Sequence, residues 1–482
     1  MRNHAVVGAL ALLVPVLSTI AGASTYNVRD FGAKGDQSTN DQASIQTAVD
    51  ACTAAGGGTV YFPAGDYLSS TIRLGSNVRV HLDAGATLWV SQSPEGYEDP
   101  QRGHLFVAED AEHISIVGPG IIHGQGTADY GRRPGDRGEK PAFRTGILLF
   151  ERCRHVAIRD LTILYSDAWT LHFKRCETVY VDGVTILNNY WRTNSDGIDP
   201  NSCRDVHIAN CHIVAGDDCI VLKATDPYPC ENVVVTNCTL ESIATALKLG
   251  TESRGDFRDI HFSNCVIRNT SVGIGFYLKD GAVMEDIGFS NISIETADPV
   301  AVNHVVFPLF MDIEKRDADS RVGAIRDVVF RDIQVRSGSG ILIQGMPESP
   351  IENLTMDNLS FCVARADDYT DRKKAVGGRR TTSDERDFLY AQQPSYVTLA
   401  YVKGLTLDNV RVAIAEEAFQ EHPRSAVSVH TIDDGAIRGV CRSPAGEDGS
   451  LPALALHACQ GVSVTDCSCV SDHDADGSIP GP

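Results

Sequence analysis

Residues 176–181 read Cys-Glu-Thr-Val-Tyr-Val, and the pattern returns as Cys-Arg-Asp-Val-His-Ile at 203–208 and again as Cys-Glu-Asn-Val-Val-Val at 230–235. Two more copies follow at the same interval, Phe-Arg-Asp-Ile-His-Phe at 257–262 and Met-Glu-Asp-Ile-Gly-Phe at 284–289. Each copy alternates apolar and other residues, which is the pattern of a short strand with one face inward. The repeat therefore predicts a solenoid of β-strands, because a helical repeat needs longer runs with a 3.6-residue period.

The repeat extends in both directions along the chain. Its central apolar residue advances by a constant interval at each step from Val179 to Ile287. Weaker copies centre on Val78, Ile114, Val156, Val328, Leu354, Leu405 and Val462. Each turn of a solenoid contacts only the turns next to it. A solenoid can therefore be longer than an ordinary single domain. We expect an all-β fold, a single right-handed parallel β-helix over residues 24–470.

Identical residues one repeat apart should stack as columns. A ladder of hydrogen-bonded asparagines at a turn is predicted from Asn210, Asn237, Asn264 and Asn291. Two columns of buried thiols are predicted from Cys176, Cys203 and Cys230, and from Cys211, Cys238 and Cys265. Disulfides, with the pairing left open, are expected among the cysteines outside that register, Cys441, Cys459, Cys467 and Cys469.

Both ends of the chain depart from the repeat. Residues 1–23 have the basic start, apolar stretch and small-residue end of a secretory signal peptide, so we expect a soluble protein exported to the extracellular space or a bacterial periplasm. Residues 41–55 predict a short helix, N-capped by Thr39 or Asn40, that caps the solenoid and protects its open sheet edge. Residues 471–482 predict an acidic, disordered tail.

Charge and insertions narrow the choice of partner. The formal net charge of −21 argues against a nucleic-acid binder, which would carry a basic face. An acidic substrate is not excluded, because a local group of lysines can act on an acidic protein. The interval from Ile114 to Val156 holds a basic, glycine-rich run at 131–140, and such insertions project from one face of a solenoid, often the binding face. We expect a monomer with no membrane partner.

The densest acidic group lies within the regular repeats, in Asn194-Ser195-Asp196 and Gly216-Asp217-Asp218. Because one repeat interval separates Asp196 from Lys223, we expect them in one column on neighbouring rungs. Three clustered carboxylates suit acid–base catalysis, since close like charges favour a proton on one of them. Asp is also common in turns, and this reading is preferred for Asp199, which precedes Pro200.

These motifs resemble those of glycoside hydrolase family 28, the polygalacturonase and rhamnogalacturonan-hydrolase family of the pectin-lyase-like β-helix superfamily. Residues 30–36 (Asp-Phe-Gly-Ala-Lys-Gly-Asp) and 56–65 (Gly-Gly-Gly-Thr-Val-Tyr-Phe-Pro-Ala-Gly) resemble the opening of the family, and residues 194–196 and 216–218 resemble its Asn-Thr-Asp and Asp-Asp motifs. The resemblance covers roughly residues 25–340. It implies that Asp217 is the general acid, that Asp196 and Asp218 activate water, and that the anomeric carbon is inverted.

The sequence departs from the family at two motifs. Residues 242–248 (Ser-Ile-Ala-Thr-Ala-Leu-Lys) stand where polygalacturonases carry Gly-His-Gly, and Arg-Ile-Lys is also missing. Lys223, Lys248 and Lys279, on successive rungs, are predicted to bind uronate carboxylates, the alternative being solvated strand-end lysines. Asn194, Trp191 and Tyr277 complete the predicted substrate-binding set, although Trp191 suits packing almost as well as stacking on a sugar.

The favoured function is hydrolysis of a pectic polysaccharide, a galacturonan or rhamnogalacturonan. The alternatives are a polysaccharide lyase on the same scaffold, which would need a basic residue and often calcium, and a non-catalytic carbohydrate-binding β-helix. No cofactor and no metal is expected, because the active region lacks a cluster of His and Cys with ligand spacing.

Overall fold

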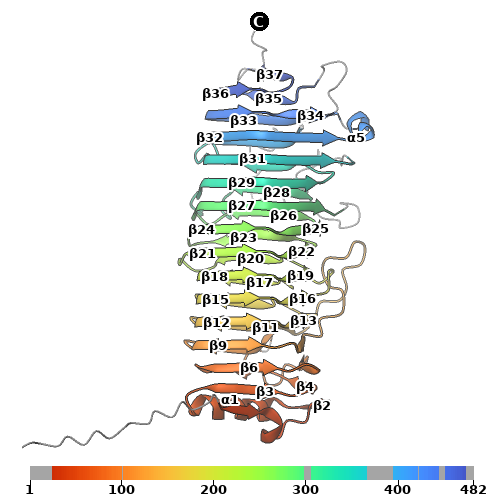
Figure 1. The fold of residues 1–482 in the computed structure, drawn as a ribbon, viewed down its shortest axis with the longest axis vertical. Coiled ribbons are helices and arrows are strands. Elements are labelled where there is room, and N and C mark those ends of the chain that lie inside the picture. Colours follow the sequence, from red (N-terminus) through yellow and green to blue (C-terminus); the bar gives the residue numbers. More distant parts are fainter. Residues whose placement is uncertain are drawn as a thin grey trace, which may run out of the picture.

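The computed structural model describes residues 24–99, 101–297, 306–365, 395–421, 423–443 and 451–473. Its strands stack along one long axis, with α1 at the N-terminal end (Figure 1). Val179 pairs in parallel with Val206, and Val206 with Val233, so that one repeat makes one turn of the solenoid. The predicted right-handed parallel β-helix is confirmed.

Three parallel stacks of strands form the walls. The repeat sheet contains the predicted six-residue pattern and consists of β1 (Thr25–Asn27), β3 (Gly58–Phe62), β6 (Val78–Leu82), β9 (Glu112–Val117), β12 (Arg154–Arg159), β15 (Glu177–Asp182), β18 (Arg204–Ala209), β21 (Cys230–Thr236), β24 (Phe257–Ser263), β27 (Val283–Thr296), β29 (Ala324–Arg336), β31 (Ile351–Val363), β32 (Ser395–Ile414), β33 (Ser425–Arg438) and β36 (Gln460–Thr465).

The second sheet consists of β2 (Asp36–Asn40), β4 (Gly65–Ser69), β7 (Ala86–Val90), β10 (Ile121–His123), β13 (Thr162–Leu164), β16 (Thr185–Leu187), β19 (His212–Ala215), β22 (Thr239–Ser242), β25 (Val266–Thr270) and β34 (Cys441–Ser443). The third sheet consists of β5 (Ile72–Arg73), β8 (Arg102–Glu109), β11 (Arg144–Glu151), β14 (Leu171–Lys174), β17 (Ile198–Asn201), β20 (Ile220–Ala224), β23 (Thr245–Ser253), β26 (Val272–Leu278), β28 (Phe307–Ile313), β30 (Ile341–Gln344), β35 (Leu454–His457) and β37 (Val470–His473). The longer strands β27, β32 and β33 pair with strands of more than one sheet.

The predicted asparagine column is confirmed at the turn between the repeat sheet and the second sheet, and hydrogen bonds join its members in two pairs, because the Asn264 amide donates to Thr236 Oγ1 at 3.4 Å. Asn210, Asn237, Asn264 and Asn291 all have φ between 52° and 56°, the left-handed region that asparagine tolerates well. The side-chain amide of Asn291 donates to Asn264 Oδ1 at 2.8 Å, and that of Asn237 to Asn210 Oδ1 at 3.4 Å. The column satisfies polar groups at a turn where backbone pairing is interrupted.

Residues 42–54 form α1 (Gln42–Ala54), which buries Ile45, Ala48, Val49 and Cys52 against the first turns of the solenoid. The predicted cap at Thr39 or Asn40 is wrong, because the N-cap is Asp41. The Asp41 carboxylate accepts hydrogen bonds from the backbone of Lys34 and Gly35 instead of capping the helix. A 3₁₀ turn, η1 (Val28–Phe31), precedes α1, and the short helix α5 (Glu416–Glu421) lies near the C-terminal end (Figure 1).

The predicted signal peptide at 1–23 and residues 474–482 of the predicted tail lie outside the described residues. The expectation that disorder begins at residue 471 is wrong, since β37 continues to His473 and pairs with β35.

All fourteen cysteines lie among the described residues and carry free thiols, so the predicted disulfides near the C-terminus are wrong. The two predicted columns are buried as expected. Cys203 Sγ contacts the carbonyl oxygens of Phe173 and Asn201, 30 and 2 residues earlier, and Cys459 makes contacts at the same two spacings. Cys467 likewise repeats the contacts of Cys211. These cysteines therefore continue the solenoid columns rather than forming a separate cross-linked unit.

We predict that unreduced, denatured protein will titrate fourteen thiols. In the native protein Cys469 should react first, because it is the exposed cysteine whereas the others are buried or half-buried. Reaction with a chromogenic disulfide reagent measures both numbers, and Cys469→Ser should remove the fast phase. A denatured count of twelve or fewer would restore the disulfide interpretation.

Candidate active site

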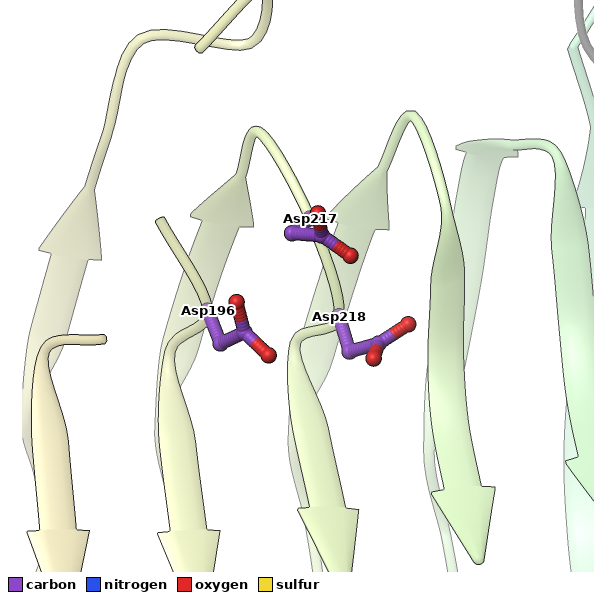
Figure 2. Close-up of side chains that lie close together, drawn as sticks. All are labelled: Asp196, Asp217 and Asp218. Carbon is purple, nitrogen blue, oxygen red and sulfur yellow. The ribbon is translucent and has the colours of Figure 1, made fainter. Parts of the chain in front are cut away.

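Three aspartates meet on the third sheet, just before two of its strands. Asp196 precedes β17, and the pair Asp217 and Asp218 precedes β20. One carboxylate oxygen of each lies within 4.8 Å of those of the other two, and all three residues are buried. Asp196 and Asp218 occupy corresponding positions on adjacent rungs, with Asp217 one residue before Asp218 (Figure 2). The predicted cluster of carboxylates is thus present in the structure.

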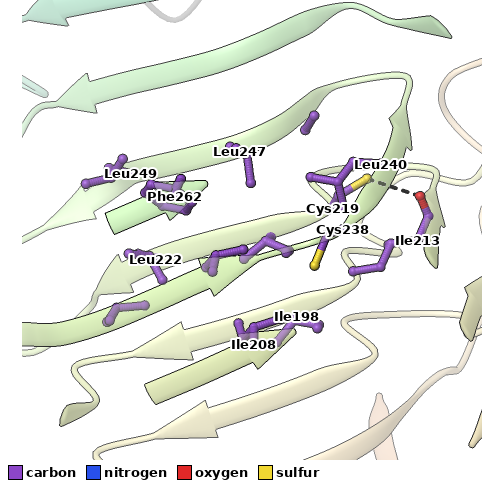
Figure 3. Close-up of a cluster of buried hydrophobic side chains, with 14 of the residues drawn as sticks. Ile198, Ile208, Ile213, Cys219, Leu222, Cys238, Leu240, Leu247, Leu249 and Phe262 are labelled. Carbon is purple, nitrogen blue, oxygen red and sulfur yellow. Dashed lines mark hydrogen bonds between the residues drawn. The ribbon is translucent and has the colours of Figure 1, made fainter. Parts of the chain in front are cut away.

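A dry apolar interior supports these strand starts. Ile198 and Ile220 pair in register and point inward, where they are fully buried. Cys219, directly after Asp218, packs inside the same cluster and donates to the Ile213 carbonyl (Figure 3). Each such side chain contributes about 1.5–3 kcal/mol by leaving water, so the backbone that carries the aspartates is rigidly held.

The predicted column of Asp196 and Lys223 is wrong. On the third sheet Lys223 pairs with Asn201, a shorter step than the repeat, because the connection before β17 (188–197) is longer than the connection before β20 (216–219). The 27-residue step holds on the repeat sheet but not here. Lys223 still reaches the cluster through its long side chain, with Nζ 3.9 Å from Asp196 Oδ2.

Asp217 is held as an anion by its neighbours. The backbone N–H of Asn194 donates to Asp217 Oδ2 at 2.9 Å, and the guanidinium of Arg132 pairs with the same oxygen. Burial alone would raise the pKa of Asp217, but the charges of Arg132 and Lys248 and the Asn194 hydrogen bond outweigh it and hold the pKa below its ordinary value.

Asp196 has the opposite environment. Burial, followed by the nearby charges of Asp199 and Asp217, raises the pKa of Asp196 well above its ordinary value. Its Oδ1 has no hydrogen-bond partner among the described residues. Asp218, by contrast, accepts from Lys248 Nζ at 2.7 Å and from the backbone of Thr245 at 3.2 Å. The carboxyl groups of Asp196 and Asp217 therefore differ in their readiness to hold a proton.

Asp199 does not serve the turn role predicted for it. It lies within β17, is completely buried and faces Lys223, whose Nζ is 3.9 Å from Asp199 Oδ1. Neither carboxylate oxygen has a hydrogen-bond partner among the described residues. Burial raises the pKa of Asp199 to about 8 despite the opposing charge of Lys223. The sequence did not reveal that Asp199 is a buried partner of Lys223, because the proline after Asp199 is typical of a turn.

The three predicted lysines reach different partners. Lys223 and Lys248 border the carboxylates, and the pKa of Lys223 is raised because Asp196 and Asp199 overcome the effect of burial. Lys279 instead pairs with Glu314, with Nζ 2.6 Å from the Glu314 carboxylate. The lysines do not form one column, since Lys248 pairs in register with Val221. All three are held by carboxylates rather than by solvent, so the strand-end alternative is wrong for them.

The remaining predicted residues line the edge of the cluster. The Tyr277 ring lies 5.1 Å from Lys248 Nζ, whereas Asn194 is exposed and contributes its backbone N–H. Trp191 packs against Ile243, Ala297 and Val306, which supports the packing alternative for this residue.

Sequence reasoning missed Trp169 and Arg132. The ring of Trp169 lies 4.6 Å from Lys223 Nζ, and no repeat or motif marked it. Arg132 stands in the basic insertion, but nothing local in the sequence indicated that it contacts Asp217.

Among the described residues, the only group of carboxylates, histidines and cysteines with a spacing suited to a metal ion is this aspartate cluster. Arg132 on Asp217 and Lys248 on Asp218 already supply positive charge there. A cation would have to displace both, so the charge balance does not favour a metal.

The burial of Asp199 predicts that stability falls as pH rises. Its pKa of about 8 in the folded protein exceeds the ordinary 3.8, so between these values the folded state binds more protons than the unfolded chain. The contribution of Asp199 to stability is fully present below its ordinary pKa of 3.8, and it is lost as the pH rises through the folded-state pKa of about 8. We expect Asp199→Asn to raise Tm relative to the native protein at about pH 8–9, and to raise it less at about pH 4. Thermal melts across this range measure the difference, and Asp205→Asn on strand β18 of the repeat sheet is the matched control. A pH-independent Tm difference would contradict the prediction.

Comparison with known proteins agrees with the site motifs. The family model for glycosyl hydrolases family 28 matches residues 52–375. A probable polygalacturonase of Vitis vinifera is 29% identical over 221 residues, covering 42% of this chain and 45% of that protein. A polygalacturonase of Malus domestica is 26% identical over 211 residues, with the same two coverages. The chain thus spans about half the length of these curated relatives.

Solved structures share the fold. An exopolygalacturonase from Thermotoga maritima has a TM-score of 0.61 at 22% identity, covering 70% of this chain and 87% of that one. The family 28 exopolygalacturonase of Yersinia enterocolitica has a TM-score of 0.57 at 17% identity, covering 96% and 80%. Within the described residues, no helix has the length and apolar character that a membrane crossing requires. The family match includes both aspartate motifs and two thirds of the chain, and the protein belongs to glycosyl hydrolases family 28.

Proposed function

We propose that this protein is a secreted, monomeric glycosidase that hydrolyses a pectic polysaccharide with inversion at the anomeric carbon. The observation that carries the proposal is the cluster of three buried aspartates, in which the surroundings of Asp196 favour the protonated form and those of Asp217 favour the ionised form. Glycoside hydrolysis needs one carboxyl group that gives a proton and one carboxylate that takes a proton from water. Family membership supports this assignment.

Asp217 acts as the general acid towards the glycosidic oxygen. Asp196 and Asp218 together hold the attacking water and accept its proton. Their corresponding positions on adjacent rungs support this pairing, because strands about 4.8 Å apart leave room for one water between two carboxyl groups. The anomeric configuration of the released sugar tests this assignment directly.

A uronate-containing glycan is the proposed substrate. Lys223, Lys248 and Arg132 surround the aspartates, and such cations suit a chain of sugar carboxylates. Similarity to proteins named polygalacturonase supports a galacturonan. The replacement of the family's Gly-His-Gly motif by residues 242–248 supports a rhamnogalacturonan or another substituted pectin instead of the plain polymer.

The first test is release of reducing ends from purified pectic fractions by the native protein and by Asp217→Asn. We expect the variant to lose at least about 100-fold in turnover, because it removes the proton donor while changing little volume. Asp205→Asn makes the same change on strand β18 of the repeat sheet and should keep full activity and the same Tm. Retention of more than about a tenth of the native rate by Asp217→Asn would remove Asp217 from the acid role.

The stereochemical outcome tests the roles of Asp196 and Asp218. Proton NMR of the first product should show an anomer opposite to that of the cleaved bond, since water attacks directly. Early spectra are needed because the released sugar mutarotates. A retained configuration would require a covalent intermediate on one of the carboxylates and would overturn the water-activation assignment.

A further inference from the structure

Arg132 joins two segments that are far apart in the sequence. It belongs to the connection between β10 and β11, residues 124–143. This connection is fastened to the loop before β17 by backbone hydrogen bonds, from Tyr130 N to Trp191 O at 3.0 Å and from Thr193 N to Tyr130 O at 2.8 Å. These bonds place the Arg132 guanidinium on Asp217, 85 residues further along the chain.

The two neighbouring arginines differ in their surroundings. The Arg132 side chain is 21% exposed, so it lies at the rim of the aspartate cluster, within reach of a polysaccharide. Arg133 is 56% exposed and pairs with Asp129, away from Asp217. The position of Arg132 is therefore specific, and it does not follow from the basic run as a whole.

The contact between Arg132 and Asp217 conflicts with the acid role of Asp217. A general acid must carry a proton, and a guanidinium beside a carboxyl group favours the ionised form. The charged groups around Asp217 are Arg132 from the connection, Lys248 from β23, and the carboxyls of Asp196 and Asp218. If Arg132 leaves, the burial that raises the pKa of Asp217 is still opposed by Lys248 and the Asn194 hydrogen bond but no longer by the guanidinium, so the preference of Asp217 shifts towards the protonated form.

Asp196 supplies the proton that Asp217 lacks. Its buried carboxyl favours the protonated form, and its oxygen lies within 4.8 Å of the other two carboxylates. Transfer of that one proton from Asp196 to Asp217 leaves Asp196 ionised and Asp217 protonated. A single transfer therefore prepares both the base and the acid, with no proton gained or lost.

We propose that Arg132 is a specificity-determining residue: the carboxylate of a uronate in the substrate draws Arg132 away from Asp217, and the proton on Asp196 then passes to Asp217. The inference rests on the proposed hydrolase function. A neutral sugar or a methyl-esterified uronate offers no full negative charge to the guanidinium, so Arg132 stays on Asp217 and the acid stays ionised. The enzyme thus selects uronates in two ways, because a uronate both binds Arg132 and allows Asp217 to become protonated.

The test compares Arg132→Gln with the native protein on de-esterified polygalacturonate and on fully methyl-esterified pectin. We expect the variant to lose about tenfold or more in kcat/KM on the de-esterified substrate, the loss typical of a charge-assisted contact. The rate on the methyl-esterified substrate should rise, because without Arg132 the carboxyl group of Asp217 is no longer held in its ionised form. The preference for the de-esterified substrate should therefore shrink.

The pH profile separates this role from a structural one. The profile of kcat/KM reports the free enzyme, so both limbs should move to higher pH in Arg132→Gln, where the cation beside Asp217 is lost. The profile of kcat reports the substrate complex and should move less, because Arg132 has already left Asp217 there. Arg132→Lys keeps a positive charge and should keep part of the preference.

Arg133→Gln is the matched control and should leave both rates, both profiles and Tm unchanged. Equal losses on the two substrates, or unshifted limbs of kcat/KM in Arg132→Gln, would overturn the inference while the hydrolase function stood. Failure of the native protein to release reducing ends from any pectic fraction would remove the proposed function and the inference with it.

Discussion

Parallel backbone pairing between successive rungs is the interaction on which every other feature of this protein depends. Strands held about 4.8 Å apart bring chemically equivalent positions into contact, one rung above the next. The asparagine column, the cysteine columns and the stacked rings of Phe262 and Phe289, 4.7 Å apart, all follow from that spacing. The same spacing sets Asp196 beside Asp218, so catalytic geometry is built into the ladder itself.

The third sheet uses this rigidity to keep charges where they would otherwise be costly. Buried carboxylates are unfavourable unless cations or hydrogen-bond donors compensate them. Lys248 compensates Asp218 and Arg132 compensates Asp217, while Asp196 and Asp199 keep oxygens without hydrogen-bond partners among the described residues. The apolar interior beneath the strands holds these groups together, and the incomplete compensation leaves a carboxyl group that favours its proton.

The site therefore has two parts with different mechanical character. The aspartates, Lys223 and Lys248 lie on strands or directly before them, whereas Arg132 lies on a connection that a few backbone hydrogen bonds fasten at its base. A side chain on a strand keeps its place during turnover. Arg132, on a connection, can leave the Asp217 carboxylate for the carboxylate of the substrate. Binding energy from a charged substrate is then spent on changing the protonation of the catalytic groups, in addition to holding the sugar.

The fold, the family and the position of the aspartate cluster could be predicted from residue order, because they depend on local patterns that recur at a fixed interval and on two short motifs. Which side chains face one another could be seen only in the folded chain. The connections differ in length from rung to rung, so Lys223 pairs with Asn201 and Cys459 rejoins a cysteine column. The ion pair between Arg132 and Asp217 joins residues 85 positions apart, and no local pattern encodes a contact formed only when two loops meet.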